Sequence, residues 1–291
     1  MVQTMRLALG LTLGGGLAVA ALWLARRARR RRLGAQSTNR VLVTGGAGFV
    51  LANFVHDWLS TDTTATAVIF DRPQAWDQTV HAHLQTFIDE ERLAFFDGDC
   101  CDSSSFARLS VEHGQNFAFV VSGAALTPTL AEERERAFRV LDVNFGGLLR
   151  TLEWAGSLPK LRRFIHISSD AVLSVPGLLG TGAAASPGAK QHVVPAMSSY
   201  ALSKVAGEAA LKNLSAHFKV DAVSVRFSDV WGHLDRDTGA RNRHNAPFWC
   251  CRHVVDQSEG PLQIAAASLE DVGWVRHVPN PLNRKLVPVH A

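Results

Sequence analysis

From residue 40 onward, short hydrophobic runs alternate with longer stretches of mixed polarity. The runs have the length of strands, and the stretches have the length and spacing of helices. The predicted strands are Val41–Thr44, Ala67–Phe70, Leu93–Phe96, Ala118–Val121, Arg163–Ile167 and Ala222–Arg226. The predicted helices are Phe49–Leu59, Gln74–Ile88, Ser104–His113, Glu132–Ala155 and Ser199–Phe218. Alternating strands and helices predict an α/β fold with a parallel sheet covered on both faces.

Two segments interrupt this alternation. Leu173 to Ala196 is rich in Gly, Ala, Ser and Pro, which predicts a surface loop. Residues 233–291 show little periodicity.

The N-terminus carries a hydrophobic run from Leu7 to Ala25, which is 19 residues without a charge. This is about the minimum length for a membrane span. Six arginines follow between residues 26 and 32, whereas only Arg6 precedes the run. The positive-inside rule therefore predicts a single-pass anchor with the body of the protein facing the cytosol. An organelle-targeting peptide is the alternative, because the segment is Arg-rich and free of acids; a secretory signal normally has its charges before the hydrophobic run.

Composition describes a globular body, with 47% hydrophobic and 19% charged residues. The net charge of +4 comes from residues 1–33, which hold seven arginines and no acid; the remainder has 23 basic and 26 acidic residues. A mildly acidic body argues against nucleic acid as a partner. The four cysteines form the adjacent pairs Cys100–Cys101 and Cys250–Cys251, which predicts reduced thiols. Neither these pairs nor the 12 histidines have ligand spacing, so no metal site is predicted.

A glycine-rich turn follows the first predicted strand and opens the first predicted helix. Glycines let the backbone approach a pyrophosphate, and a helix N-terminus favours its negative charge. The candidate cofactor-binding residues of this turn are Gly45, Gly46, Gly48, Phe49 and Val50. Asp71 ends the second strand, where a carboxylate can accept hydrogen bonds from the adenosine ribose and repel a 2′-phosphate. The sequence therefore favours NAD over NADP, although the neighbouring Arg72 carries the opposite charge.

The only tyrosine, Tyr200, stands four residues before Lys204. On a helix these positions share one face, so the phenol lies beside an ammonium. A neighbouring cation favours the phenolate, and we expect it to lower the pKa of Tyr200. A phenol tuned in this way can exchange a proton with a secondary alcohol.

Together these motifs resemble the extended short-chain dehydrogenase/reductases, the NAD-dependent epimerase/dehydratases, from about Arg40 to about Trp249. The resemblance rests on the order and spacing of motifs along the chain. They are Thr44–Phe49, Asp71, Gly98–Asp102, Ala124–Ala125, Asn144, Ser168–Ser169, Tyr200 with Lys204, and Arg226–Gly232. It implies a Rossmann-type doubly wound sheet, residues 34–232, between the anchor segment 1–33 and a truncated or divergent substrate-binding segment, residues 233–291.

The resemblance also implies roles for individual residues. Tyr200 is the general acid/base, and Lys204 lowers its pKa and holds the nicotinamide ribose. Ser169 hydrogen-bonds the reacting oxygen, and Asn144 supports the active-site helix. The remaining implied cofactor contacts are Asp99 and Cys100, which flank the adenine, and Ala124 and Ala125. A homodimer through helices of the active-site domain is implied by resemblance alone.

The chain departs from the family pattern at three places. Leu51 stands where the family has its third glycine, so we expect a local shift and weaker dinucleotide binding. Ser122 stands where many members carry His, and only residues 233–291 remain for a substrate domain.

Three hypotheses for function follow. The first is an NAD-dependent oxidoreductase or epimerase acting on a nucleotide-sugar-like substrate. The second is the same chemistry on a membrane lipid alcohol such as a 3β-hydroxysteroid. The third is a dinucleotide-binding protein without catalysis, suggested by Leu51 and the short C-terminal segment.

Overall fold

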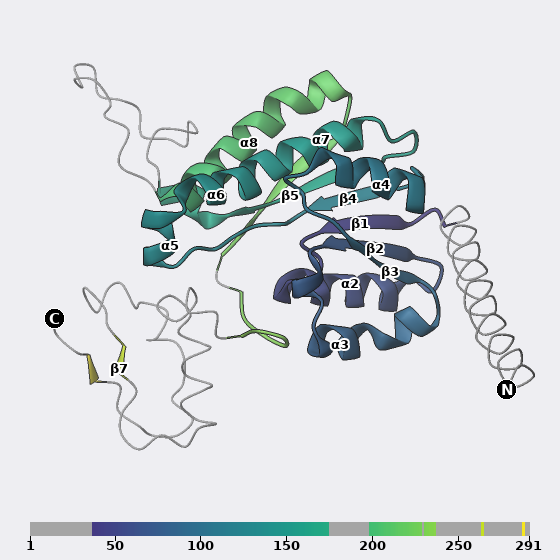
Figure 1. Ribbon diagram of the computed structural model, residues 1–291, viewed down its shortest axis with the longest axis horizontal. Helices are drawn as coiled ribbons and strands as arrows, with labels where there is room; N and C mark the ends of the chain where they lie inside the picture. Colours follow the sequence, from purple (N-terminus) through teal and green to yellow (C-terminus); the bar gives the residue numbers. More distant parts are fainter. Residues whose placement is uncertain (1–36, 175–197, 229, 237–262, 265–286, 289–291) are drawn as a thin grey trace, which may run out of the picture. The chain divides into compact units, whose positions relative to one another are not determined.

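The computed structural model describes residues 37–174, 198–228, 230–236, 263–264 and 287–288 (Figure 1). The chain divides into two compact units, residues 1–228 and 229–291; the sequence-based boundary is at residue 232. The second unit contains a short parallel pair, β7 (Gln263–Ile264) and β8 (Val287–Pro288). The predicted anchor at residues 7–25 lies outside the described residues, as do residues 175–196 of the predicted loop and Cys250–Cys251. Within the described ranges, no helix has the length and hydrophobicity needed to cross a bilayer.

The first unit is built on a parallel six-stranded sheet with the order β3-β2-β1-β4-β5-β6 (Figure 1). The strands are β1 (Arg40–Thr44), β2 (Thr66–Asp71), β3 (Leu93–Asp97), β4 (Phe119–Ser122), β5 (Arg163–Ser169) and β6 (Ala222–Phe227). All six predicted strands are confirmed. The order reverses between β1 and β4, so the carboxyl ends of these two strands form the point at which doubly wound sheets bind ligands.

Helices cover both faces of this sheet. The helices are α2 (Phe49–Thr61), α3 (Gln78–Asp89), α4 (Ser103–His113), α5 (Leu130–Glu135), α6 (Ala137–Leu141), α7 (Gly147–Gly156) and α8 (Ser199–Phe218). Figure 1 shows α2 and α3 on one face and α4, α7 and α8 on the other. The described architecture is therefore the predicted α/β sandwich.

Two of the predicted helices differ from the structure. The single helix Glu132–Ala155 is divided into α5, α6, a π-helical segment (Asp142–Gly146) and α7. The division begins at Arg136, whose backbone (φ −132°, ψ 27°) leaves the helical conformation.

The helix predicted from Gln74 is a 3₁₀ turn (Pro73–Ala75) followed by α3, which begins where the Asp77 side chain accepts hydrogen bonds from two backbone N–H groups. Another short 3₁₀ helix, Asp170–Ser174, occupies the start of the predicted loop.

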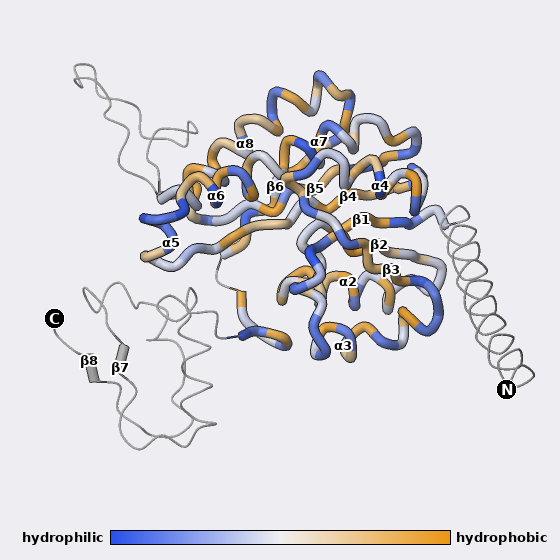
Figure 2. The backbone as a smooth tube through the Cα atoms, viewed as in Figure 1, coloured by the Kyte–Doolittle hydropathy of each residue, from blue (hydrophilic) through white to orange (hydrophobic). Residues whose placement is uncertain are grey.

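The core lies between the sheet and the helices α4, α7 and α8. Every residue of β1 is buried, and hydrophobic residues line the central strands (Figure 2). Phe70, Phe96, Phe106 and Trp154 form a chain of aromatic contacts, and the Trp154 indole donates to Ser110 Oγ at 2.9 Å. Burying each such side chain contributes about 1.5–3 kcal/mol, so this cluster holds the strand ends in place.

Candidate functional site

The glycine-rich turn at the end of β1 packs directly against the turn that follows β4. Gly45 has φ +72°, and a Cβ there would lie 2.6 Å from the Ala124 Cα. Thr44 Oγ1 accepts hydrogen bonds from the backbone N–H groups of Gly123 (3.2 Å) and Ala124 (3.4 Å). The two turns therefore form one unit, and only glycine fits at position 45.

Helix α2 begins at this turn with an uncapped N-terminus. Gly48 is its N-cap, no side chain caps the first turn, and that turn contains no acidic residue. Its first residues, Phe49 and Val50, are half-buried, and the neighbouring Gly46 packs so closely that a Cβ would lie 2.9 Å from Ile69 Cγ1. This arrangement fits the pyrophosphate of a dinucleotide, which Gly45, Gly48, Phe49 and Val50 would hold.

Asp71 lies beside the turn at the end of β2. Its Oδ2 accepts a hydrogen bond from the Ala47 N–H (3.1 Å), and its Oδ1 accepts from the Arg72 N–H (2.8 Å). Burial raises the pKa of this carboxyl group, against the opposite effect of the two N–H groups. The predicted ribose-binding residue is thus held next to the predicted pyrophosphate site.

Leu51 is accommodated by a space left at Gly123. Leu51 is buried, and its Cδ1 would lie only 2.3 Å from a Cβ at position 123. A leucine side chain on α2 and the missing side chain after β4 therefore complement each other. The expected local shift is unnecessary where the opposing residue has no side chain.

Asp99 and Cys100, the residues expected to flank the adenine, lie in the segment after β3 and are held by bonds within the protein. Asp99 Oδ1 accepts a hydrogen bond from the Cys101 N–H at 2.8 Å, and Oδ2 lies 3.5 Å from Arg139 NH2. Cys100 is a buried free thiol whose Sγ points toward the Val143 carbonyl at 3.9 Å, and burial raises its pKa to about 11.

Ligand atoms of Asp99, Cys100 and Cys101 lie within 4.8 Å of one another, a spacing that could hold a metal ion. Burial also raises the pKa of Cys101, however, and so opposes the thiolates that a metal would need.

Tyr200 and Lys204 lie on one face of α8, as the spacing predicts. The Lys204 Nζ is 5.6 Å from the centroid of the Tyr200 ring and donates a hydrogen bond to the Ile167 carbonyl at 2.8 Å. Only 3% of Lys204 is exposed, and this desolvation lowers its pKa to about 8. A buried lysine therefore lies close to the ring of Tyr200 and is bonded to the Ile167 carbonyl of β5.

The prediction that the pKa of Tyr200 is lowered is wrong. The pKa of Tyr200 is raised, because burial disfavours the phenolate more than the Ser169 hydroxyl favours it. The carboxylate of Asp170, which accepts a hydrogen bond from Ser169 Oγ at 3.2 Å, raises it further. Ser169 is the last residue of β5, whereas the sequence placed it after the strand. Its side chain forms a hydrogen bond with Tyr200.

Asn144 lies in the π-helical segment and joins three parts of the site. Its Oδ1 accepts from the Leu126 N–H (2.7 Å), and its Nδ2 donates to the Leu126 carbonyl (3.0 Å) and to Ser203 Oγ (3.2 Å). These bonds tie the segment after Ala124 and Ala125 to helix α8. Ser203 is a residue that the sequence analysis did not single out.

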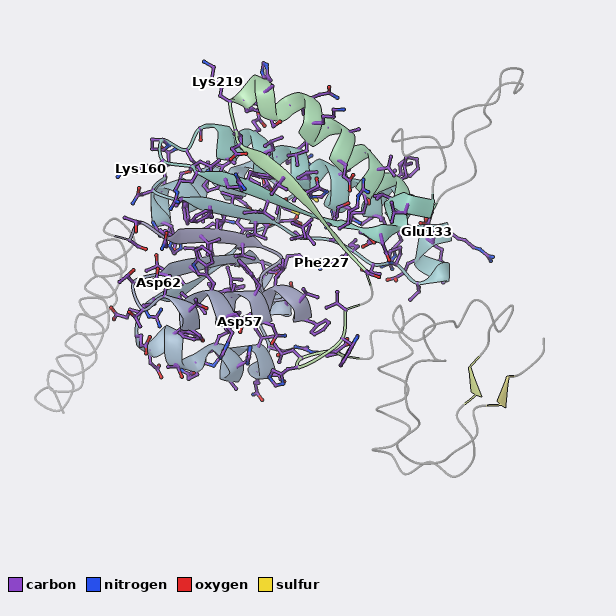
Figure 3. All side chains as sticks on the ribbon, turned by 180° about the vertical axis from the view of Figure 1, so that it is seen from behind. Asp57, Asp62, Glu133, Lys160, Lys219 and Phe227 are labelled. Carbon is purple, nitrogen blue, oxygen red and sulfur yellow. The ribbon has the colours of Figure 1, made fainter. Side chains whose placement is uncertain are left out.

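Two carboxylates were also missed. Glu133, on α5 (Figure 3), accepts a hydrogen bond from the Ser199 N–H at the start of α8. Glu208 accepts from Ser168 and Arg226. Glu208 had a detectable signal, because it follows Tyr200 and Lys204 at intervals of four residues.

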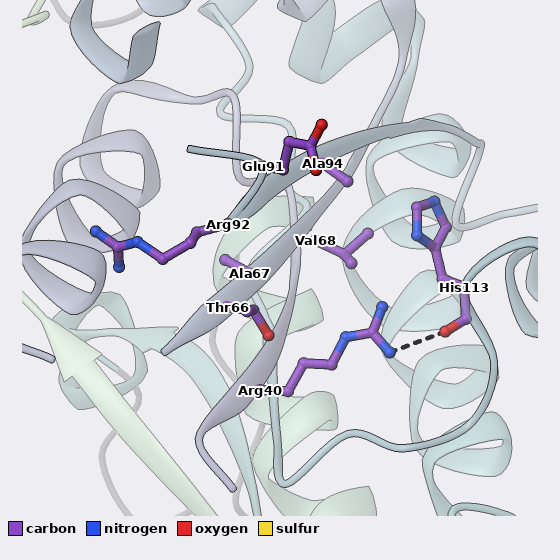
Figure 4. Close-up of a pocket in the computed structure, with 8 residues that line it drawn as sticks. All are labelled: Arg40, Thr66, Ala67, Val68, Glu91, Arg92, Ala94 and His113. Carbon is purple, nitrogen blue, oxygen red and sulfur yellow. Dashed lines mark hydrogen bonds between the residues drawn. The ribbon is translucent and has the colours of Figure 1, made fainter. Parts of the chain in front are cut away.

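A small pocket lies at the opposite end of the sheet, at the amino ends of β1, β2 and β3. Arg40 donates there to the His113 carbonyl at 2.8 Å (Figure 4). Its lining is Arg40, Thr66, Ala67, Val68, Glu91, Arg92, Ala94 and His113. Because parallel sheets of this type bind ligands at their carboxyl ends, this pocket is distinct from the candidate cofactor site.

The chain is similar in sequence to two kinds of known enzyme. It is 30% identical over 193 residues to human dTDP-D-glucose 4,6-dehydratase, a match that covers 66% of this chain and 51% of that protein. It is 33% identical over 147 residues to a 3 beta-hydroxysteroid dehydrogenase/Delta 5-->4-isomerase of Mycobacterium tuberculosis, covering 49% of this chain and 36% of that one. The chain thus spans about half or less of the length of these curated relatives.

Solved structures share the fold at lower identity. The UDP-N-acetylglucosamine 4-epimerase of Methanobrevibacter ruminantium has a TM-score of 0.59 and 21% identity, over 79% of this chain and 66% of that one. The dTDP-glucose 4,6-dehydratase of Bacillus anthracis, solved with NAD, has a TM-score of 0.58 and 19% identity, over 79% and 65%. Residues 41–264, which include the glycine turn and Tyr200, match the NAD dependent epimerase/dehydratase family. The chain belongs to this family of NAD-dependent enzymes.

Proposed function

We propose that this protein is an NAD-dependent oxidoreductase or epimerase that transfers hydride at a secondary alcohol or ketone, with Tyr200 as the acid/base. One observation carries the proposal: Tyr200, Lys204 and Ser169 lie together at the carboxyl end of β5. The glycine turn and Asp71 lie at the carboxyl ends of β1 and β2 in the same sheet. Bound NAD would supply the hydride acceptor or donor.

The residues of the chain handle the proton. In the oxidative direction, the Tyr200 oxygen takes the hydroxyl proton as the carbinol carbon loses its hydride; in reduction, it returns a proton to the carbonyl oxygen. The Ser169 hydroxyl would donate a hydrogen bond to the reacting oxygen. Because the pKa of Tyr200 is raised, the proton-donating form dominates at neutral pH, and we expect the oxidative direction to speed up as the pH increases.

We propose a nucleotide sugar as the substrate. Relatives and neighbours support this choice, since their names specify dTDP-glucose and UDP sugars. The similarity to the mycobacterial hydroxysteroid enzyme supports a second candidate, a 3β-hydroxysteroid or related lipid alcohol. A membrane anchor at residues 7–25 would bring the protein close to such a substrate.

The test is a product assay with the purified full chain and NAD. dTDP-glucose, UDP-glucose, UDP-N-acetylglucosamine and a 3β-hydroxysteroid are supplied separately, and products are identified by NMR and mass spectrometry, because an epimerase leaves no net NADH. We expect turnover of one nucleotide sugar and its loss by about a hundredfold or more in Tyr200→Phe, since general acid/base catalysis typically contributes that much. Activity that survives Tyr200→Phe would refute the assigned role, and NAD binding without any turnover would support the non-catalytic hypothesis.

Anchoring and assembly are further parts of the proposal. We propose that residues 7–25 anchor the protein with its body in the cytosol, and organelle targeting remains the alternative. Protein released from membranes by a carbonate wash would contradict the anchor. A homodimer rests on the family resemblance, with Phe138 of α6 (88% exposed) as a candidate contact; a monomer in analytical ultracentrifugation would contradict it.

A further inference from the structure

A largely buried carboxylate behind the catalytic pair has no part in the proposed reaction. Glu208 lies on α8 four residues after Lys204 and eight after Tyr200, so the three share one helix face. Only 11% of its side chain is exposed. Removing a carboxylate from water is unfavourable unless charge and hydrogen bonds compensate.

Two strands provide this compensation. Arg226 of β6 donates from Nε to Glu208 Oε1 (2.8 Å) and from NH2 to Oε2 (2.7 Å), a two-point ion pair. Ser168 of β5 donates from Oγ to Oε1 at 2.6 Å. These bonds hold the pKa of Glu208 below its usual value, with the Arg226 bond as the main cause. Ser168 and Arg226 are register partners across β5 and β6, so one carboxylate fastens both strand ends to α8.

The two neighbours of Ser168 are the groups that touch the catalytic pair. The carbonyl of Ile167 accepts the Lys204 hydrogen bond, and the Ser169 hydroxyl lowers the pKa of Tyr200. Any displacement of Ser168 relative to α8 would alter both contacts at once.

We propose that Glu208 is a positioning residue. By holding Ser168 and Arg226 it fixes the end of β5, and thereby the Ile167 carbonyl and Ser169, at the distances that Lys204 and Tyr200 require. Glu208 acts through these groups and does not contact the substrate. The inference deepens the proposed role of Tyr200, but its test reads the tyrosine directly and needs no substrate.

The single tyrosine makes the measurement specific. Biosynthetic replacement by 3,5-difluorotyrosine labels position 200 alone and lowers the intrinsic pKa of the phenol into a range where the folded protein can be titrated by ¹⁹F NMR. Lys204, Asp170 and Ser169 are the groups whose effects on this phenol such a titration reports. In Glu208→Gln we expect the pKa of residue 200 to rise by about 0.5 to 1 unit, the equivalent of one hydrogen bond.

The matched control is at the other end of the same two strands. Arg163 donates to Asp221 at 2.7 Å in an ion pair whose side chains are 52% and 60% exposed. Asp221→Asn makes the same chemical change as Glu208→Gln, and we expect it to leave the pKa of residue 200 unchanged. Equal shifts in the two variants, or no shift in either, would overturn the proposal.

A second variant decides the outcome if Glu208→Gln does not fold. Ser168→Ala removes the 2.6 Å bond and leaves the Glu208–Arg226 pair intact, so we expect a smaller rise of the pKa. An unchanged pKa of residue 200 in this folded variant would show that the bonds of Glu208 to Ser168 and Arg226 only stabilise the fold. These titrations stand even if the wild type turns over no substrate, so failure of the proposed function is distinguishable from failure of the positioning role.

Discussion

The cofactor half and the catalytic half of the site are built in opposite ways. Around β1 and β4, neighbouring atoms come close because side chains are missing: the backbone of Ala124 approaches Gly45, and the Leu51 side chain approaches Gly123. Around β5 and α8, buried polar side chains fill the space, and Lys204, His166 and Asn144 are each at most 3% exposed. The first half should therefore be damaged by added atoms and the second by changes in charge or hydrogen bonding.

The largest effect is expected for Gly45→Ala. The new methyl group would meet backbone atoms of Ala124 and Gly123 at 2.6–2.9 Å, in a backbone conformation (φ +72°) that disfavours side chains. We expect a loss of roughly 2–5 kcal/mol in the free energy of unfolding, measured in urea, together with loss of NAD binding by calorimetry.

Gly114→Ala is a control that separates the two causes of the loss in Gly45→Ala, steric collision of the methyl group and backbone strain. Gly114 has nearly the same φ (+73°), but nothing lies within 4 Å of its added Cβ. Because its ψ of −171° lies in a region that is essentially restricted to glycine, the loss should be about 1–3 kcal/mol from backbone strain alone, with NAD binding unchanged. If both variants lose equal stability, close packing of the two turns is not what requires Gly45.

The effects expected for the Leu51–Gly123 pair are smaller than that of Gly45→Ala. Gly123→Ala should cost about 1–3 kcal/mol, because the added Cβ would lie 2.3 Å from the Leu51 Cδ1, whereas Leu51→Ala should cost about 2–4 kcal/mol through the cavity that it leaves. In the double variant the methyl group has room, so the losses should be less than additive by about 1 kcal/mol or more. Strict additivity in urea unfolding would mean that the two side-chain positions do not compete for the same space.

The smallest effect concerns the charge of Lys204. Its pKa is lowered from about 10.5 in an unfolded chain to about 8 in the folded protein, so the unfolded state binds more protons between these values. The destabilising contribution of this buried lysine is therefore largest below pH 8 and is relieved as the pH rises through 8 toward 10.5.

The measurement is the difference in unfolding free energy between the wild type and Lys204→Met. This difference should shift in favour of the wild type by about 1 kcal/mol over the first pH unit above 8. Tyr200 and the cysteines titrate in both chains, so to first order their contributions cancel. A difference that is independent of pH would contradict a lowered pKa.

The sequence predicts those features that depend on neighbours in the chain. The six strands follow from hydrophobic runs, and the shared face of Tyr200 and Lys204 follows from a four-residue interval on one helix. The glycine turn is also local, because strand, turn and helix are consecutive.

Features that depend on distant partners were not predictable in this way. Leu51 was interpreted as a defect because its partner, Gly123, lies on another strand end. The direction of the pKa shift of Tyr200 depends on how deeply α8 packs, which the spacing does not specify. The helix expected over residues 132–155 kept an acceptable average pattern across its breaks, so Arg136 and the π-helical segment gave no signal.

The π-helical segment Asp142–Gly146 has a consequence for insertions and deletions. A π turn holds one residue more than an α-helical turn, so the helix completes about the same rotation with an extra residue in it. Deleting one residue here would let α6 and α7 merge into a regular helix and leave Val140, now 2% exposed, facing the core, but the bulge that carries Asn144 would be lost. The extra residue therefore disturbs the packing of neither helix, and it lies in the segment that holds Asn144 against Leu126 and Ser203.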